Sequence, residues 1–400
     1  MPMNFNGEYL STIGIEMESE ILNRSRVTDT LNGLGRYYGG VPPFSVTRDA
    51  SSENMVELIR MENSLTHIPI YTHNKLFQKF FSRNNPQSYG YELVINPTPI
   101  TELKPLLARI TNSLISMGDS TTPRSAVHFH VGFAHNVKLM RKLLQVCLKI
   151  DPLLYMMGGM GRTYRGNKNL SAYARPLTNS AAVPLGSEMR MIDGERLRSN
   201  RENAVGFVRV INPQAALEAK TTADFWKNFG VYPSLLGINK YHPARYSGCN
   251  FYAILMHGTM EFRHFNQSFD YELIYTIAKF LRATVEMSTL LKKNDLVEFS
   301  TEDGSKPLSY GKAEEILWII DKYCRMYEVD DLPSKEEYDL LMENITKSTY
   351  EPIPQNAVKT HNREFTIPAN LVGNLLEVKS PLENCQTDIH NIQVSTILGE

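Results

Sequence analysis

The chain has 400 residues, of which 42% are hydrophobic and 21% charged, and its formal net charge is −1. The apolar content excludes a mostly disordered chain, and the charge balance excludes a chain-wide basic field that would attract nucleic acid or an anionic membrane. No apolar run approaches the ~20 residues needed to cross a bilayer, and residues 1–10 lack the blocks of a signal peptide. We expect a cytoplasmic protein without nucleic-acid or membrane partners.

The cysteines are far apart in the sequence and form no CxxC pair. This spacing favours buried thiols in a reducing compartment over disulfides or structural zinc. The four are Cys147, Cys249, Cys324 and Cys385.

The first predicted strand, Ile13–Glu20, alternates apolar residues with carboxylates. Side chains alternate across a β-strand, so the acids would share one face and the apolar residues the other. Alone, this pattern is most often a half-exposed strand with a solvated acidic face. The acids are Glu16, Glu18 and Glu20, and the apolar residues are Ile13, Ile15 and Met17.

A turn-rich passage at residues 22–43 leads to Phe44–Glu53, which is predicted to be a short strand and a polar loop. Asp49 in this loop is either an Asx-turn residue or a site residue. Met55–Ser82 then has helical spacing that is interrupted near Pro69.

The next strand contains a single acid, Glu92, and is predicted to stop within Asn96–Pro99, because two prolines there disfavour regular pairing. A helix follows over Thr101–Met117, with Thr101 as its N-cap.

Ser125–Phe133 is predicted to be a strand with His128 and His130 on one face and apolar residues on the other. Either histidine alone is more often a structural residue. A pair at i and i+2 beside several acids favours a site.

An amphipathic helix over Val137–Leu154 is predicted to end at Asp151–Pro152. The region from about 158 to 205 is rich in Gly, Ser, Asn and Arg, with weak periodicity, which is typical of functional or mobile loops. Its arginines are either solvated or available to bind a triphosphate or a substrate carboxylate. No GxxxxGK[ST] or GxGxxG motif occurs there.

Further strands and helices are predicted after this region, and the last helix is expected to cover the sheet. They are a strand at Phe207–Asn212, a helix at Ala215–Phe229, a hairpin of strands 246–255 and 258–265 with Glu261 and Arg263 on one face, and a long helix at Asp270–Leu291. Residues 292–400 are predicted to be a C-terminal helical appendage, with helices at Gly311–Tyr327 and Ser334–Ile345, and an extended tail.

If these polar strands share a sheet, seven side chains converge on one face: Glu16, Glu18, Glu92, His128, His130, Glu261 and Arg263. At about 7 Å, two carboxylates repel each other by roughly 2 kcal/mol at an effective dielectric constant near 20. Bound cations would offset this repulsion, and an oxygen-rich ligand set favours Mg²⁺ or Mn²⁺ over a closed zinc site.

Six motifs occur in a fixed order: GIEMESE, RDASSE, YGYELVINP, VHFHVGF, RYSGCNFYAI and GTMEFRHFN. This set resembles the amidoligase family of phages and bacteria, which has the glutamine-synthetase and glutamate-cysteine-ligase type of fold. The resemblance covers residues 9–291. It implies an α+β catalytic domain over residues 1–291, in which a curved antiparallel sheet forms an active-site funnel with helices packed on its outer face.

The resemblance also implies ATP, Mg²⁺ or Mn²⁺, and ligation of a carboxylate to an amine, in the host cytoplasm if the chain is phage-encoded. The implied metal ligands are Glu16, Glu18, Glu92, His128, His130 and Glu261. The implied catalytic residues are Asp49, Glu261 and Arg263, and the implied ATP- or substrate-binding residues are Arg162, Tyr173, Arg245 and Asn250. Asn96–Pro97 departs from the family's Ser-Pro, and His264–Asn266 from its more variable polar run.

Two other functions stay open. A metal-dependent hydrolase or peptidase is suggested by the histidine pair, although no HExxH or HxHxDH motif occurs. A non-catalytic protein that binds metal or nucleotide, such as a phage assembly protein, would use the acids only to tie the sheet together. For the ligase, the carboxylate and the amine could belong to an amino acid, a peptide or a protein side chain, and the oligomeric state is open.

Overall fold

The structure is a computed structural model that describes residues 12–21, 44–48, 89–116, 126–158, 174, 177, 182–185, 206–209, 212–229, 243–299 and 308–347. Its main strands are β1 (Thr12–Ile21), β2 (Phe44–Arg48), β3 (Tyr89–Pro99), β4 (Ala126–Gly132), β7 (Cys249–Asn250) and β8 (Thr259–Asn266). They form a six-stranded antiparallel sheet in the order β2-β3-β1-β4-β8-β7. A separate two-stranded sheet pairs β5 (Ala182–Leu185) with β6 (Gly206–Arg209). The expected α+β class with an antiparallel sheet is confirmed.

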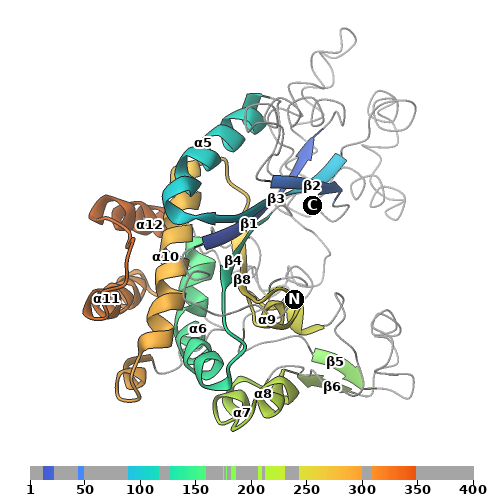
Figure 1. Cartoon of the computed structure of the whole chain (residues 1–400), viewed down its shortest axis with the longest axis vertical. Helices are drawn as coiled ribbons and strands as arrows, with labels where there is room; N and C mark the ends of the chain where they lie inside the picture. The colour runs from blue at the N-terminus through green and yellow to red at the C-terminus, as the bar shows by residue number, and fades with distance from the viewer. Residues whose placement is uncertain are drawn as a thin grey trace, which may run out of the picture.

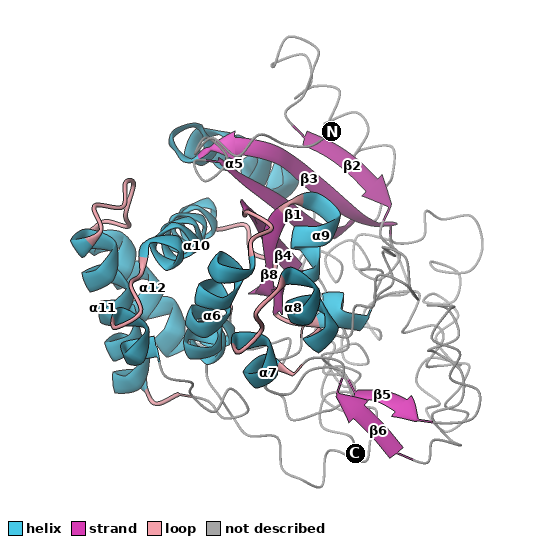
Figure 2. Cartoon of the chain, turned by 60° about the horizontal axis from the view of Figure 1, so that its bottom comes forward, coloured by secondary structure: helices cyan, strands magenta, loops and turns pink. Residues whose placement is uncertain are grey.

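The larger helices form a layer on one face of the sheet. They are α5 (Ile100–Ser116), α6 (Val137–Met157), α10 (Tyr271–Leu290), α11 (Tyr310–Met326) and α12 (Lys335–Lys347). Helices α5, α6 and α10 contact the sheet, and α11 and α12 lie on the outer side of that layer (Figure 1, Figure 2). Apolar residues of all five helices belong to one hydrophobic core. Within the described ranges, no helix is long and apolar enough to cross a membrane.

Strand β1 lies near the centre of the sheet, and its two faces have different surroundings. Ile13, Ile15 and Met17 are completely buried and pair with Val131, Phe129 and Val127 of β4, so apolar side chains meet on the helix-covered face. The acids occupy the opposite face, where Glu16 pairs with His128 and Glu18 pairs with Glu92. A register slip of one residue would exchange the two faces, and burial of the apolar set therefore fixes the alignment of the polar set.

Strand β3 ends at Pro99, within the predicted stretch Asn96–Pro99, and its pairing is irregular over the prolines. The strand continues through Pro97 to Pro99, and its register with β1 shifts between Ile13 and Ile15. Pairing with β2 stops at Ile95. The prolines thus occupy a bulged stretch with β1 as its only described neighbour, where a missing backbone donor is tolerated. The following helix begins at Ile100, so Thr101 lies in its first turn and does not cap it.

The prediction that Pro152 ends α6 is wrong. The helix continues to Met157, and Gly158 caps it through a bond from its N–H to the Leu154 carbonyl. A proline inside a helix removes one backbone hydrogen bond and costs roughly 3 kcal/mol. Burial of the five residues after Pro152 offsets this cost.

The hairpin predicted over 246–265 is only partly present. Two residues, Cys249 and Asn250, pair with β8, and helix α9 (Tyr252–His257) replaces the rest of the expected strand. Tyr252, Ala253 and Ile254 are buried on this helix, and consecutive apolar residues of this kind do not distinguish a buried helix from a strand. Gly258 ends α9 with φ 71°, a left-handed conformation that favours glycine.

The helix predicted over Ala215–Phe229 is two helices, α7 (Pro213–Leu217) and α8 (Thr222–Asn228). Thr221 separates them because its side chain accepts a bond from the Asp224 N–H, while the Asp224 side chain accepts from the Thr221 N–H. The predicted helices over 270–291, 311–327 and 334–345 are confirmed as α10, α11 and α12. The helix predicted over Met55–Ser82 lies outside the described residues.

A register shift in the β4–β8 pair has consequences for both faces of the sheet. Val127 pairs with Phe265 and Phe129 pairs with Phe262, so two residues of β8 stand opposite His128. These two are Arg263 and His264. A bulge of this kind re-aims neighbouring side chains. Arg263 joins the acidic face, whereas His264 points to helix α6.

A candidate two-metal centre on the polar face of the sheet

The candidate metal centre is built around Glu16, whose two carboxylate oxygens face different histidines. Glu16 Oε2 lies 3.1 Å from His128 Nδ1, and Glu16 Oε1 lies 3.2 Å from His130 Nε2. His128 and His130 are neighbours on the same face of β4, two residues apart. One carboxylate therefore lies between two imidazole rings and contacts each through a separate oxygen.

Two overlapping groups of ligand atoms result. In one, Glu16, Glu92 and His128 each offer a donor atom, and the three atoms lie within 4.8 Å of one another. In the other, Glu16, His130 and Glu261 satisfy the same criterion. Glu18 lies beside the first group, with its Oε1 3.6 Å from His128 Nε2. Glu16 belongs to both groups, as a bridging ligand of a two-metal site would.

The second group is held in place by residues around it. Asn250 Nδ2 donates to Glu261 Oε2 at 2.5 Å, and Arg263 Nη1 donates to Glu261 Oε1. His130 Nδ1 lies 3.0 Å from the Thr259 hydroxyl, which leaves Nε2 facing Glu16 and Glu261. Fixing one ring nitrogen by a hydrogen bond is how proteins orient a histidine that binds metal through the other.

Burial strengthens every charge interaction in this cluster. Burial opposes ionisation of Glu16, but the bonds to His128 and His130 outweigh it and hold the pKa of Glu16 well below its usual range. Burial opposes ionisation of Glu261 as well, and Arg263 and His130 together lower its pKa. Both acids are thus carboxylates at neutral pH, the form that binds a cation.

The two histidines differ in their tendency to take up a proton. Burial, followed by the charge of Arg263, lowers the pKa of His128. Burial acts in the same direction on His130, but Glu261 and Glu16 outweigh it and raise the pKa of His130. The surroundings therefore favour the neutral, ligating form more at His128 than at His130, where a metal ion would compete more strongly with a proton.

The structure brings most of the predicted site residues together. The six predicted metal ligands lie on one face, and Arg263 and Asn250 contact one of them. Arg245 lies on the short helix η5 (Pro243–Tyr246), and its charge acts on His257, whose ring centroid is 6.2 Å from that of His130. Asp49, Arg162 and Tyr173 lie outside the described residues.

Two residues beside the centre were not predicted as site residues. Thr259, which contacts His130, was assigned only to a strand. His257, whose pKa is lowered by burial and then by His130, was assigned only to a turn. A signal was present for Thr259, since it is two residues before Glu261 on the same strand face.

The fold and the cluster together define an α+β protein with a polar sheet face suited to divalent cations. The cluster contains four carboxylates but only one guanidinium and two imidazoles. Of the two imidazoles, that of His128 has a lowered pKa. This imbalance and the oxygen-rich donors suit hard divalent ions. No model of a known protein family matches the chain, and no curated protein matches it.

Proposed function

We propose that the protein is an ATP-dependent ligase that joins a carboxylate to an amine through an acyl phosphate. The observation that supports this best is the shared position of Glu16 between the His128 and His130 groups. Two divalent ions that share a ligand are typical of enzymes that transfer phosphoryl groups. The antiparallel sheet agrees with the resemblance to amidoligases, and we propose that it curves into their active-site funnel with the helices on its outer face.

The two groups of ligand atoms supply the proposed metal ligands. Glu16, Glu92 and His128 would hold one Mg²⁺ or Mn²⁺, with Glu18 beside it. Glu16, His130 and Glu261 would hold the other. Divalent ions held there would supply positive charge to offset the negative charge of ATP and of the transferred γ-phosphoryl group.

The protein residues would mainly position the reacting groups. Arg263 and Asn250 fix Glu261 from two sides, so that its carboxylate stays ionised and aimed at the centre. Phosphoryl transfer to the substrate carboxylate gives an acyl phosphate, and attack by the amine releases phosphate. Arg263 would stabilise the charged oxygens, and Asp49 would orient the amine or accept its proton.

The proposed ATP- and substrate-binding residues extend beyond the metal cluster. We propose that Arg245 binds ATP or the substrate carboxylate from η5, beside Asn250. Arg162 and Tyr173 are proposed for the same role because of the resemblance. Guanidinium groups suit both ligands, since each presents a planar pair of acceptor oxygens.

A product assay tests this proposal. The purified chain is incubated with ATP, Mg²⁺ and pools of carboxylates and amines. ADP and phosphate should form only when both pools are present, and a product should appear whose mass equals the sum of two components minus water. Glu261→Ala should abolish the reaction. Glu315→Gln, on the exposed surface of α11, should not affect it. Formation of AMP and pyrophosphate would refute the acyl-phosphate route.

Two further outcomes separate the competing functions. Hydrolysis of a peptide or another substrate without any ATP requirement would favour a metal-dependent hydrolase. Calorimetric binding of Mg-ATP with no consumption in the presence of all substrate pools would favour a non-catalytic binding protein.

A further inference from the structure

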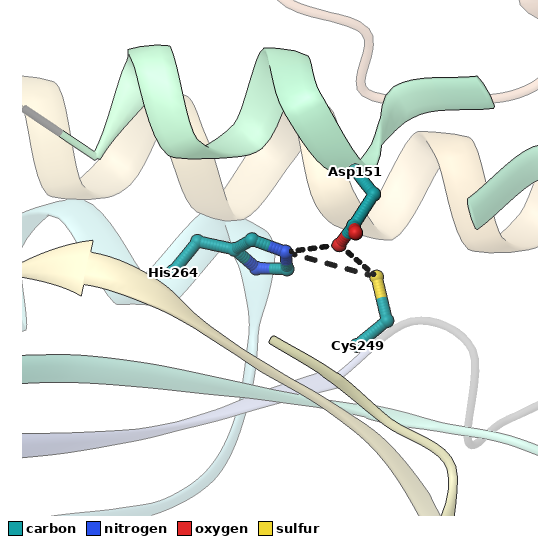
Figure 3. Close-up of side chains that lie close together, drawn as sticks. All are labelled: Asp151, Cys249 and His264. Carbon is teal, nitrogen blue, oxygen red and sulfur yellow. Dashed lines mark hydrogen bonds and ion pairs between the residues drawn. The ribbon is translucent and has the colours of Figure 1, made fainter. Parts of the chain in front are cut away.

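A second cluster of metal-ligand side chains lies on the opposite face of the sheet, against helix α6. Asp151 comes from α6, Cys249 from β7 and His264 from the bulge in β8, and all three point to one spot between helix and sheet (Figure 3). Each is at most 1% exposed. The cluster is thus separate from the acidic centre, which occupies the other face.

The three donor atoms form a compact triangle. His264 Nε2 lies 2.8 Å from Asp151 Oδ1, Cys249 Sγ lies 3.6 Å from the same oxygen, and Sγ lies 3.9 Å from Nε2. A tetrahedral zinc ion with bonds of about 2.0–2.3 Å separates its ligand atoms by about 3.3–3.6 Å. The observed edges scatter around that range, so one ion fits after shifts of a few tenths of an ångström.

This geometry does not suit a nucleophilic Cys-His-Asp triad. In such a triad the acid and the nucleophile contact different ring nitrogens. Here the carboxylate and the thiol both face His264 Nε2. Nδ1 of His264 is buried and has no hydrogen-bond partner among the described residues.

The surroundings support ligation. The second oxygen of Asp151 accepts the Leu177 N–H at 2.9 Å, the kind of contact that fixes a ligating carboxylate. The backbone at Gly248 approaches the cluster so closely that an added Cβ would clash with the Tyr155 hydroxyl and lie 2.5 Å from His264 Nε2, so this close approach requires glycine. Cys147 lies one turn before Asp151 on the same side of α6 and is also buried.

We propose that Asp151, Cys249 and His264 bind a structural transition-metal ion, with zinc as the class of metal that suits the donor set. A divalent ion with one carboxylate, one thiolate and one neutral imidazole is electrically neutral, and it can therefore be buried without a net charge. The thiol proton leaves to solvent on binding. The ion would join α6 to strands β7 and β8, which carry Asn250, Glu261 and Arg263 on their other face.

Metal content and a cobalt spectrum test this proposal. The full chain is expressed with added zinc, dialysed and analysed by mass spectrometry, and a second sample is unfolded, stripped and refolded with Co²⁺. We expect about one zinc ion per chain and, with cobalt, a thiolate-to-metal charge-transfer band. Removing the zinc should lower the melting temperature. The proposal would be overturned if the purified protein is folded but contains no zinc, refolds equally well with and without metal, and shows no charge-transfer band with Co²⁺.

Matched variants test which residues bind the ion. Cys249→Ser should lose the charge-transfer band, whereas Cys324→Ser, another buried cysteine that contacts the Ala283 carbonyl, should keep it. Glu261→Ala should also keep it, since that residue belongs to the acidic face. If Cys249→Ser does not fold, the presence or absence of the charge-transfer band in the Co²⁺-loaded wild type still tests the proposal. A Cys147–Cys249 disulfide found by non-reducing peptide mapping would overturn the proposal.

Discussion

Glu16 and His128 stand opposite each other on β1 and β4, and their side chains approach to 3.1 Å although 112 positions separate them in the sequence. The contact exists because apolar residues on the other face of both strands fix the register. The candidate metal centre therefore depends on the packing of the helix-covered face as much as on its own charges.

Arg263→Met tests what compensates the negative charge of the buried Glu261 carboxylate. Removing one partner of a buried ion pair costs about 3–5 kcal/mol, because the remaining charge is left uncompensated. We expect a loss of that order in the free energy of unfolding without metal, and a smaller loss in saturating Mn²⁺, since a cation would replace the guanidinium. Chemical denaturation with and without Mn²⁺ measures both.

The double variant Glu261→Gln/Arg263→Met is the control for this experiment. It removes both charges, so it should be more stable than Arg263→Met alone in metal-free buffer. It should gain less from Mn²⁺ than Arg263→Met does, because only the group of Glu16, Glu92 and His128 remains complete. Equal stability of the two variants, with no effect of metal on either, would contradict the assignment of Glu261 as a ligand.

Gly158→Ala tests the junction between α6 and β8. A Cβ at this position would meet the His264 carbonyl oxygen at 2.3 Å and the Phe265 Cα at 3.0 Å. Both are backbone atoms that cannot move without shifting β8. We expect the free energy of unfolding to fall by about 1–3 kcal/mol.

Gly311→Ala is the matched control. It lies in α11, where an added Cβ meets nothing within 4 Å. Alanine is the better helix former by up to about 1 kcal/mol, so this variant should be neutral or slightly stabilised. Similar destabilisation of both variants would show that the close approach at Gly158 is not the cause.

His135 gives a prediction of pH dependence outside the candidate metal sites. Burial lowers its pKa, and its Nε2 accepts a hydrogen bond from the Trp226 indole at 2.6 Å. A histidine with a lowered pKa in the folded state contributes stability above its unfolded pKa of about 6.5 and loses it as the pH falls through the folded pKa. Gln at this position can accept the same bond and does not titrate. Wild type should therefore lose stability relative to His135→Gln below about pH 6.5. A difference in unfolding free energy that is constant over this range would contradict this.

The period-two patterns predicted the faces of the sheet correctly. Glu16 and Glu18, and likewise His128 and His130, lie on the polar face because alternation of side chains is a local property of a strand. The register that pairs Glu16 with His128 is long-range, and the sequence patterns predicted the shared face but not this pairing.

Features that depend on tertiary packing were not predictable. The bulge at Arg263 and His264 turns one residue to each face, and nothing in GTMEFRHFN distinguishes it from a regular strand. Asp151 was interpreted as a residue at a helix end because Pro152 follows it, but packing carries the helix past the proline. The contact between Asp151 and His264 was therefore missed.

A Mn²⁺ titration followed by electron paramagnetic resonance tests the proposal that Glu16 is shared by two divalent ions. We expect two ions per chain with an exchange-coupled signal, because metal ions in two-metal sites lie about 3.5–4 Å apart. Glu16→Gln should remove the coupling and at least one ion, and Glu315→Gln should retain both. An uncoupled single ion in the wild type, or a coupled pair that persists in Glu16→Gln, would show that Glu16 is not a shared ligand.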